Sequence, residues 1–206
     1  MEYRRERDVI QAGFAYNAWH LLKHYEELTV GAKPSTRYEA TLTLCVLQSL
    51  LTNCYELYRS LRRSRSGIVE VLDRAVASLL VDPDVSISNT FPEVINGKSL
   101  LEHLRNAMSH PRAKATDPLT TGYVTVPDAT NIISRISFTD SPDLNYNGNV
   151  TARGRELTGG DVAQARIFTI ELPLARVTGF TEELALLLAQ PILGNWDKSV
   201  LSPLLP

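Results

Sequence analysis

The residues best suited to chemistry in this chain are Arg105 and His110, which lie five positions apart in the stretch Leu100 to Pro111. Arginine stays charged, and its planar guanidinium matches the oxygens of a phosphate group. Histidine titrates at about pH 6.5, so its imidazole suits proton transfer near neutral pH. The two residue types together point to cleavage of a phosphodiester without a metal ion.

The stretch around this pair predicts an amphipathic helix. At about 100° per residue, its apolar and polar side chains fall on opposite arcs. Ser99 and Glu102 fit a capping box at its start, and Pro111 disfavours helical backbone at His110. The apolar arc holds Leu100, Leu101, Leu104, Ala107 and Met108, and the polar arc holds Glu102, His103, Arg105, Asn106, Ser109 and His110. Such an apolar face requires burial against other helices, which would hold the polar face rigidly.

Helical geometry separates Arg105 from His110. In a regular helix the two side chains point about 140° apart. We therefore expect a frayed last turn, or a second copy of the chain, to bring them together. One set supplies a single titrating group, whereas two copies across a twofold axis supply both an acid and a base. On an RNA diester, attack by the 2′-hydroxyl would give a 2′,3′-cyclic phosphate and a 5′-hydroxyl.

Residues Arg105 to His110, Arg-Asn-Ala-Met-Ser-His, resemble the R-x4-H motif of the HEPN superfamily. That family is a small helical bundle that dimerises so that two such motifs face one another, and many members are metal-independent endoribonucleases that act as toxins or in phage defence. The resemblance implies that Arg105 and His110 are the catalytic pair and that Asn106 is the polar residue of the motif. It also implies RNA as substrate, a homodimer, an antitoxin or regulatory protein as a further partner, and no metal or cofactor.

Apolar periodicity predicts three helices before this one, over about residues 6–28, 37–63 and 68–81. In the first of them the periodic residues are Val9, Ile10, Phe14, Trp19, Leu21, Leu22, Tyr25 and Leu28. His20 and His24 share a face of that helix but have no third ligand, so no metal site is expected.

The second predicted helix is apolar nearly all round, which is typical of the centre of a bundle. Asn53 and Glu56 lie among its core residues, and buried polar groups need partners. Either neighbouring helices satisfy them, or they orient the Arg105–His110 face. They are candidate supporting residues, together with Ser109.

The second helix ends in a basic cluster of Arg59, Arg62 and Arg63. Cations at a helix C-terminus are favoured by the macrodipole, and the same side chains are candidates for contacts with RNA phosphates. Arg112 and Lys114 add positive charge beside His110.

The second half of the chain favours strands, at about residues 123–126, 131–138 and 165–172. A loop is expected over 140–160, and Thr181 is expected to cap a last helix over 182–189. We therefore predict a mostly α fold of α+β class. A HEPN-like antiparallel helical bundle spans residues 1–115, and a β-rich appendage with a final helix, residues 116–206, packs on it.

Composition bounds these expectations. Apolar residues make up 44% and charged residues 21% of the 206, as in a soluble globular protein. The net charge of −2 gives no global attraction for nucleic acid, so RNA binding would need a local basic patch.

Cys45 and Cys54 are expected as buried thiols in a reducing compartment. Neither a signal peptide nor a membrane-spanning run is apparent, so a cytoplasmic protein is expected.

Two other interpretations remain open. One is a catalytically silent HEPN-like module that binds a nucleotide or a protein partner, with Arg105 and Asn106 in a structural network at a dimer seam. The other is a helical scaffold in which the motif is accidental. No glycine-rich phosphate loop, nucleophile elbow or Cys-x-x-Cys pair supports another enzyme class.

Overall fold

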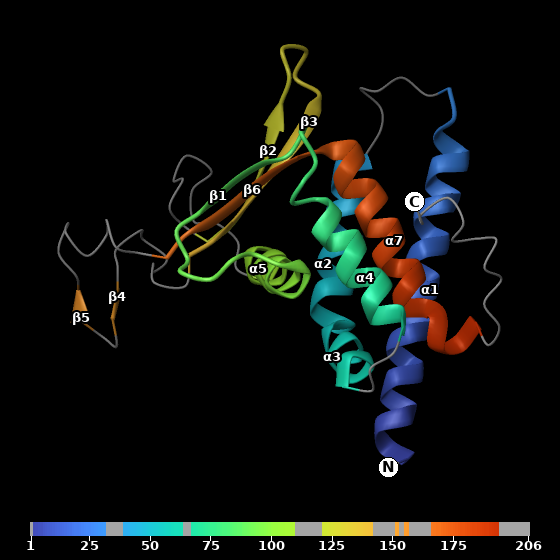
Figure 1. Cartoon of the computed structure of the whole chain (residues 1–206). Helices are drawn as coiled ribbons and strands as arrows, with labels where there is room; N and C mark the ends of the chain where they lie inside the picture. The colour runs from blue at the N-terminus through green and yellow to red at the C-terminus, as the bar shows by residue number, and fades with distance from the viewer. Residues whose placement is uncertain are drawn as a thin grey trace.

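The structure, a computed structural model, describes residues 2–31, 39–63, 67–109, 121–141, 151–152, 155–156 and 166–193. These residues form six helices and six strands (Figure 1). The helices are α1 (Glu2–Thr29), α2 (Glu39–Asn53), α3 (Tyr55–Arg63), α4 (Gly67–Ser78), α5 (Gly97–Ser109) and α7 (Leu174–Leu193). The strands are β1 (Ser86–Asn89), β2 (Gly122–Pro127), β3 (Ile133–Asp140), β4 (Thr151–Ala152), β5 (Arg155–Glu156) and β6 (Phe168–Pro173). The fold is mostly helical with a small sheet, which is the α+β class that the sequence predicts.

The main sheet is antiparallel and has the order β1-β6-β3-β2. Its three longer strands lie where the sequence predicts them, whereas the sequence predicts no strand at β1, which lies in the connection between α4 and α5. Ile87 of β1 pairs with Ile170 of β6, so the sheet joins segments from both halves of the chain. Alternate residues of β6, namely Phe168, Ile170 and Leu172, are buried in the core. The boundary expected near residue 115 lies outside the described residues.

Helix α1 packs along α7 at one edge of the helical layer (Figure 1). Its buried side consists of Ala12, Ala15, Ala18 and Leu22. Five residues of the periodic set that predicted this helix, Val9, Ile10, Phe14, Leu21 and Leu28, are exposed. The reason is that α1 carries two stripes of helical spacing. The alanine stripe, which allows a neighbouring helix to approach closely, is the buried one.

The long second helix predicted from the sequence is divided at Cys54 into α2 and α3. Two backbone hydrogen bonds still cross the break, from Cys54 N to Leu50 O at 3.0 Å and from Tyr58 N to Cys54 O at 3.1 Å. The Cys54 thiol donates to Gln11 O of α1 at 3.4 Å, and burial raises its pKa to about 12. Cys45 is exposed, contrary to the prediction that both thiols are buried.

The capping residue of α5 lies three residues before the predicted one, at Asn96 instead of Ser99. Asn96 Oδ1 accepts from the backbone N–H of Ser99 at 3.1 Å, and Ser99 Oγ accepts from the backbone N–H of Asn96 at 2.8 Å. This reciprocal pair satisfies two amides at the helix start, so Asn96 is the cap and Ser99 its partner. Similarly, α7 begins at Leu174, and Thr181, the predicted cap, lies inside it and donates to Val177 O at 2.6 Å.

Candidate functional site

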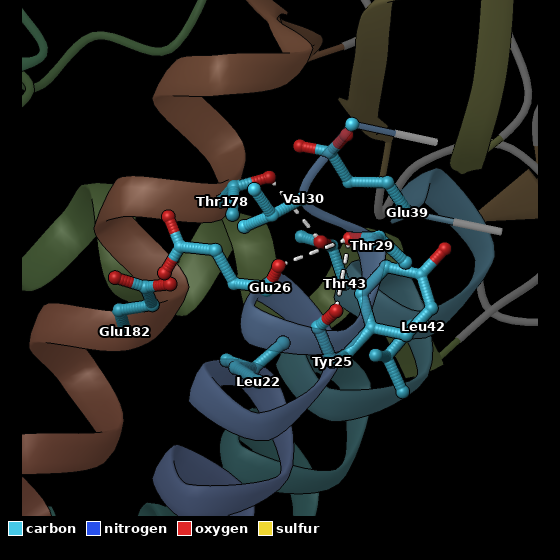
Figure 2. Close-up of a pocket in the computed structure, with 11 residues that line it drawn as sticks. Leu22, Tyr25, Glu26, Thr29, Val30, Glu39, Leu42, Thr43, Thr178 and Glu182 are labelled. Atoms are coloured by element: carbon cyan, nitrogen blue, oxygen red, sulfur yellow. Dashed lines mark hydrogen bonds between the residues drawn. The ribbon is translucent and has the colours of Figure 1, made fainter. Parts of the chain in front are cut away.

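Two cavities open between the helices, and the first has an acidic lining (Figure 2). It measures about 360 Å³ and lies between the end of α1, the start of α2 and α7. Lys23 bridges two of its carboxylates, at 3.1 Å from Glu26 and 2.8 Å from Glu182. The cavity contains none of the residues that the sequence singles out for chemistry. Its lining consists of Leu22, Tyr25, Glu26, Thr29, Val30, Gly31, Glu39, Leu42, Thr43, Thr178 and Glu182.

The second cavity, of about 440 Å³, lies between α3 and α5 and is strongly basic. Five cationic side chains and one carboxylate line it. The lining residues are Tyr55, Tyr58, Arg59, Arg62, Arg63, Lys98, Glu102 and Arg105. In a chain of net charge −2, this basic cavity is a local concentration of positive charge of the kind that a phosphate-bearing ligand requires.

Arg105 forms one wall of the basic cavity from α5. Its guanidinium carbon lies 4.6 Å from the centroid of the Tyr55 ring, within the range of a cation–π contact. Its buried Nε has no hydrogen-bond partner among the described residues. The ring therefore holds the guanidinium in place without neutralising its charge.

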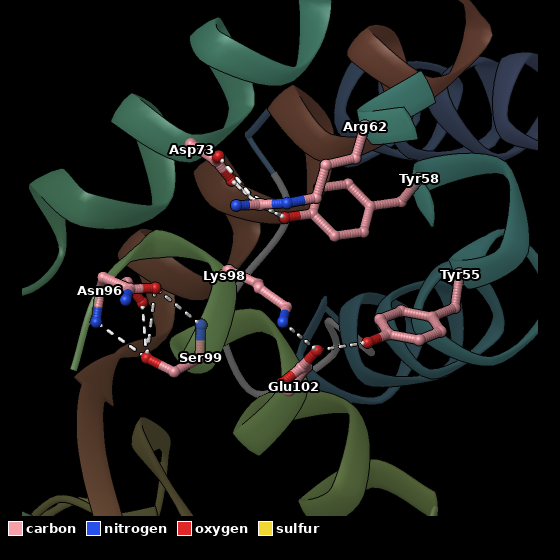
Figure 3. Close-up of polar contacts among 8 residues, drawn as sticks. All are labelled: Tyr55, Tyr58, Arg62, Asp73, Asn96, Lys98, Ser99 and Glu102. Carbon is pink, nitrogen blue, oxygen red and sulfur yellow. Dashed lines mark hydrogen bonds and ion pairs between the residues drawn. The ribbon is translucent and has the colours of Figure 1, made fainter. Parts of the chain in front are cut away.

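The Tyr55 ring is fixed in turn by α5 (Figure 3). Its hydroxyl donates to Glu102 Oε1 at 3.0 Å, and Lys98 Nζ lies 3.6 Å from the same oxygen. Burial, together with the hydrogen bond to the Glu102 carboxylate, raises the pKa of Tyr55 to about 12. Tyr55 is therefore a neutral platform at physiological pH.

A second polar cluster holds two further lining residues of the basic cavity, Tyr58 and Arg62 (Figure 3). The Tyr58 hydroxyl donates to Asp73 Oδ1 of α4 at 2.9 Å, and Arg62 donates to the Tyr58 oxygen at 2.9 Å and to Asp73 Oδ2 at 3.0 Å. Burial and the Asp73 carboxylate raise the pKa of Tyr58. Arg62 is thereby anchored between α3 and α4.

The positive charge of the cavity is only partly compensated. Arg59 pairs with Glu56 at 2.9 Å, and Lys98 shares Glu102 with Tyr55. Within the described part of the chain, Arg63 and Arg105 form no ion pair. No described carboxylate therefore offsets the positive charge of these two arginines, which leaves that charge to a bound anion.

The opposite side of α5 carries a buried network. His103 Nδ1 donates to Asp140 Oδ2 at 2.7 Å, and Asn106 Nδ2 donates to the same oxygen at 3.0 Å. The imidazole stacks on Phe168 at 4.5 Å between centroids and meets Phe91 edge-on at 4.6 Å. His103 is 8% exposed and Asp140 3%, so this network belongs to the core between α5 and the sheet.

The structure divides the predicted site residues into separate groups. Arg105, the predicted catalytic residue, lies in the same cavity as the predicted RNA-binding residues Arg59, Arg62 and Arg63. Asn106 lies in the Asp140 network, and Ser109 is half-buried at the last position of α5. His110, Arg112 and Lys114 lie outside the described residues.

The two supporting residues proposed on the second helix are not buried as predicted. Asn53 is exposed at the end of α2, and the Glu56 side chain is 44% exposed and paired with Arg59. The buried residues Leu50, Leu51, Cys54, Leu57 and Tyr58 keep helical spacing across the break, so Asn53 and Glu56 lie on the other side of the helix, away from the core.

Sequence analysis missed three residues that shape the site: Asp140, Tyr55 and Lys98. The sequence does place an acidic residue at the end of the apolar strand, which was a signal for Asp140. We instead expected Asp140 to be the first residue of a loop. Tyr55 and Lys98 carry no such signal, because their role depends on the packing of α3 against α5.

Comparison with known proteins gives no relative for this chain. No protein-family model, curated protein or solved structure matches it. The described side chains contain no group of three histidine, cysteine or acidic residues arranged to hold a metal ion. None of the described helices has both the length and the apolar composition needed to cross a bilayer.

Proposed function

We propose that this protein is a HEPN-like, metal-independent endoribonuclease in which the basic cavity holds the RNA backbone and Arg105 contacts the phosphate that is cut. The observation that carries the proposal is the position of Arg105. The arginine of the R-x4-H-like motif lies in one cavity with the three arginines of α3, and a neutral ring holds it, with no carboxylate of the described residues paired to it. A phosphate entering there gains charge-assisted hydrogen bonds from a guanidinium already in place.

The reaction that follows is transesterification within the RNA. The 2′-oxygen attacks phosphorus, a base accepts the 2′-proton, the bond from phosphorus to the 5′-oxygen breaks, and an acid protonates that oxygen. Arg105 stabilises the charge that develops on the phosphate oxygens. His110 of each of two copies is the proposed proton-transfer group, one acting as base and the other as acid.

Two substitutions test this proposal. Arg105→Ala and His110→Ala should each reduce cleavage of tRNA and total RNA in EDTA by at least about 100-fold, the scale of a lost transition-state contact or proton-transfer group. Arg74→Ala is the matched control, because Arg74 is an exposed arginine of α4 that does not line the basic cavity. Cleavage at the rate of the unmodified chain by either variant would disprove the assignment.

A second function merits a parallel test, because one observation favours it. The described lining of the basic cavity contains no histidine, and Asn106 is committed to Asp140 on the other side of α5. A module that binds a nucleotide or RNA without cutting it needs only the cations. In that case the purified protein would retain RNA on a filter and leave it intact, and Arg105→Ala would still weaken retention.

A further inference from the structure

Helix α1 carries an exposed apolar stripe on the side away from α7. Ile10 and Leu28 are each 71% exposed, Leu21 is 50% exposed and Phe14 is 40% exposed. Asn17 and His24, both exposed, complete the row. We call these six residues the α1 stripe.

The spacing of the α1 stripe is that of a coiled-coil seam. Positions 10, 14, 17, 21, 24 and 28 alternate steps of four and three residues, which are the d-to-a and a-to-d steps of a heptad. The buried alanine side of α1 satisfies its contact with α7 separately. The helix is therefore apolar on two sides, and only one of them is covered by the described chain.

We infer that the α1 stripe is the surface on which a second copy of this chain docks, through a parallel, in-register pairing of the two α1 helices. Parallel pairing places Ile10, Phe14, Leu21 and Leu28 each against its own copy and Asn17 against Asn17. Antiparallel pairing about the centre of the stripe would instead place Asn17 against Leu21 and His24 against Phe14. Leaving the polar member of such a pair without a partner is unfavourable, whereas a polar pair within a seam fixes its register.

The area is sufficient for a reversible dimer. Taking roughly 200 Å² as the full exposed area of a large apolar residue, the four apolar members expose about 450 Å² per copy. Two copies would bury about 900 Å² of apolar surface before their polar flanks are counted, which approaches the lower range of specific interfaces, about 1,200 Å². The expected dimer therefore dissociates on dilution. The α1 stripe includes no residue of the basic cavity, so this contact is separate from the pairing of two Arg105–His110 sites in the proposed function. The inference does not depend on RNA cleavage.

Sedimentation equilibrium of the full chain tests whether the stripe mediates assembly. We expect a concentration-dependent dimer, and Leu21→Glu should weaken it at least tenfold because it places two carboxylates in the seam. Val81→Glu is the matched control, since Val81 is 83% exposed and lies outside α1. A monomer at every concentration, or a dimer that Leu21→Glu leaves unchanged, would overturn the inference.

Disulfide trapping tests the direction of pairing without depending on the Glu variant. The Cys45→Ser background removes the exposed thiol. In that background, Ile10→Cys and Leu28→Cys are oxidised in three samples: each variant alone, and an equal mixture of the two. Parallel pairing predicts covalent dimers from each variant alone. Covalent dimers that form only in the mixture would show antiparallel pairing, and no dimer in any sample would show that the helices do not meet; either result overturns the inference. RNA cleavage by the same variants is assayed separately, so failure of the proposed function and failure of this inference are distinguished.

Discussion

Asp140 of β3 anchors the side of α5 that faces the sheet. One carboxylate oxygen accepts hydrogen bonds from both His103 and Asn106, and the imidazole is packed between two phenyl rings. A carboxyl group buried in this way is tolerated because it has two hydrogen-bond partners and both are fixed by the helix. The motif's Asn106 is therefore an element of the core, while its neighbour Arg105 faces the basic cavity.

Replacing Asp140 with alanine should lower the free energy of unfolding by about 3 kcal/mol, because two buried donors lose their acceptor. Asp140→Asn should be less damaging, since the amide oxygen still accepts one of the two bonds. Urea denaturation measures both. Asp84→Ala, which removes an exposed acidic side chain, is the control and should change stability by less than about 0.5 kcal/mol. Equal effects of the alanine changes at 140 and 84 would contradict a structural role for the buried carboxylate.

Glu183 gives α7 a pH dependence. Partial burial, together with the neighbouring Glu182, raises the pKa of this carboxyl above its ordinary 4.5. The folded chain therefore binds the proton more tightly than the unfolded chain, and stability falls as pH rises from about 4.5 through the raised pKa. Glu183→Gln should be more stable than the unmodified chain in urea at pH 7, and the difference should shrink towards pH 4. The exposed Glu70→Gln is the control, and a pH-independent effect of Glu183→Gln would refute ionisation of a buried carboxyl as the cause.

At the scale of elements, the basic cavity depends on how closely α5 approaches α4. Gly97, the first residue of α5, lies against the backbone of Asp73, and a Cβ atom there would be 2.5 Å from the Asp73 carbonyl oxygen. Asp73 also anchors Arg62 and Tyr58. The same contact thus sets the helix packing and the position of one cavity wall.

Gly97→Ala should therefore destabilise the protein by about 1–3 kcal/mol, because backbone atoms have to move. Gly179→Ala is the matched change, since a Cβ atom at this position inside α7 would have nothing within 4 Å, and it should stabilise by about 0.5–1 kcal/mol. Thermal and urea unfolding measure both. Two changes of the same sign would show that the close approach at Gly97 is not limiting.

Elements whose signal is local were predictable from the sequence. The alternation in Ile133–Asp140 and the apolar arc of α5 place a strand and a helix correctly to within a few residues. The cap of α5 was not predictable, because Asn96 and Ser99 are both capping residues and a turn accounts for Asn96 equally well. Contacts between residues far apart in the sequence could not be predicted from local patterns. Asn106 donates to Asp140, which lies 34 positions away. Which of the two stripes of α1 is buried depends on its packing against α7. The grouping of Arg105 with the arginines of α3 likewise depends on packing.

At the scale of the whole molecule, the balance between net charge and local charge decides how RNA would be held. The chain as a whole is weakly acidic, so attraction for RNA requires a local concentration of cations, and the five that line the basic cavity are such a group among the described residues. Such binding is short-ranged and sensitive to salt.

For four phosphate contacts on single-stranded RNA, the affinity should fall about 50-fold between 50 and 200 mM salt, following a slope of about −0.7 per contact. Fluorescence anisotropy with a labelled RNA measures the slope, using a His110→Ala protein so that the RNA stays intact. Arg63→Ala should reduce the slope by about 0.7, whereas Arg74→Ala should leave it unchanged. A slope near zero would exclude the cavity as the binding surface.

The pairing of α1 with α7 also has a consequence for synthesis. Residues 30–173 separate the two helices, so a ribosome working at about 5–20 residues per second needs roughly 7–30 s between releasing the first and beginning the second. Throughout that interval α1 lacks the helix that covers most of its alanine side, and β1 has no β6 to pair with. Until α7 emerges the nascent chain therefore exposes apolar surface that the folded protein buries, whereas α3 and α5, which line the basic cavity, are both complete by residue 109.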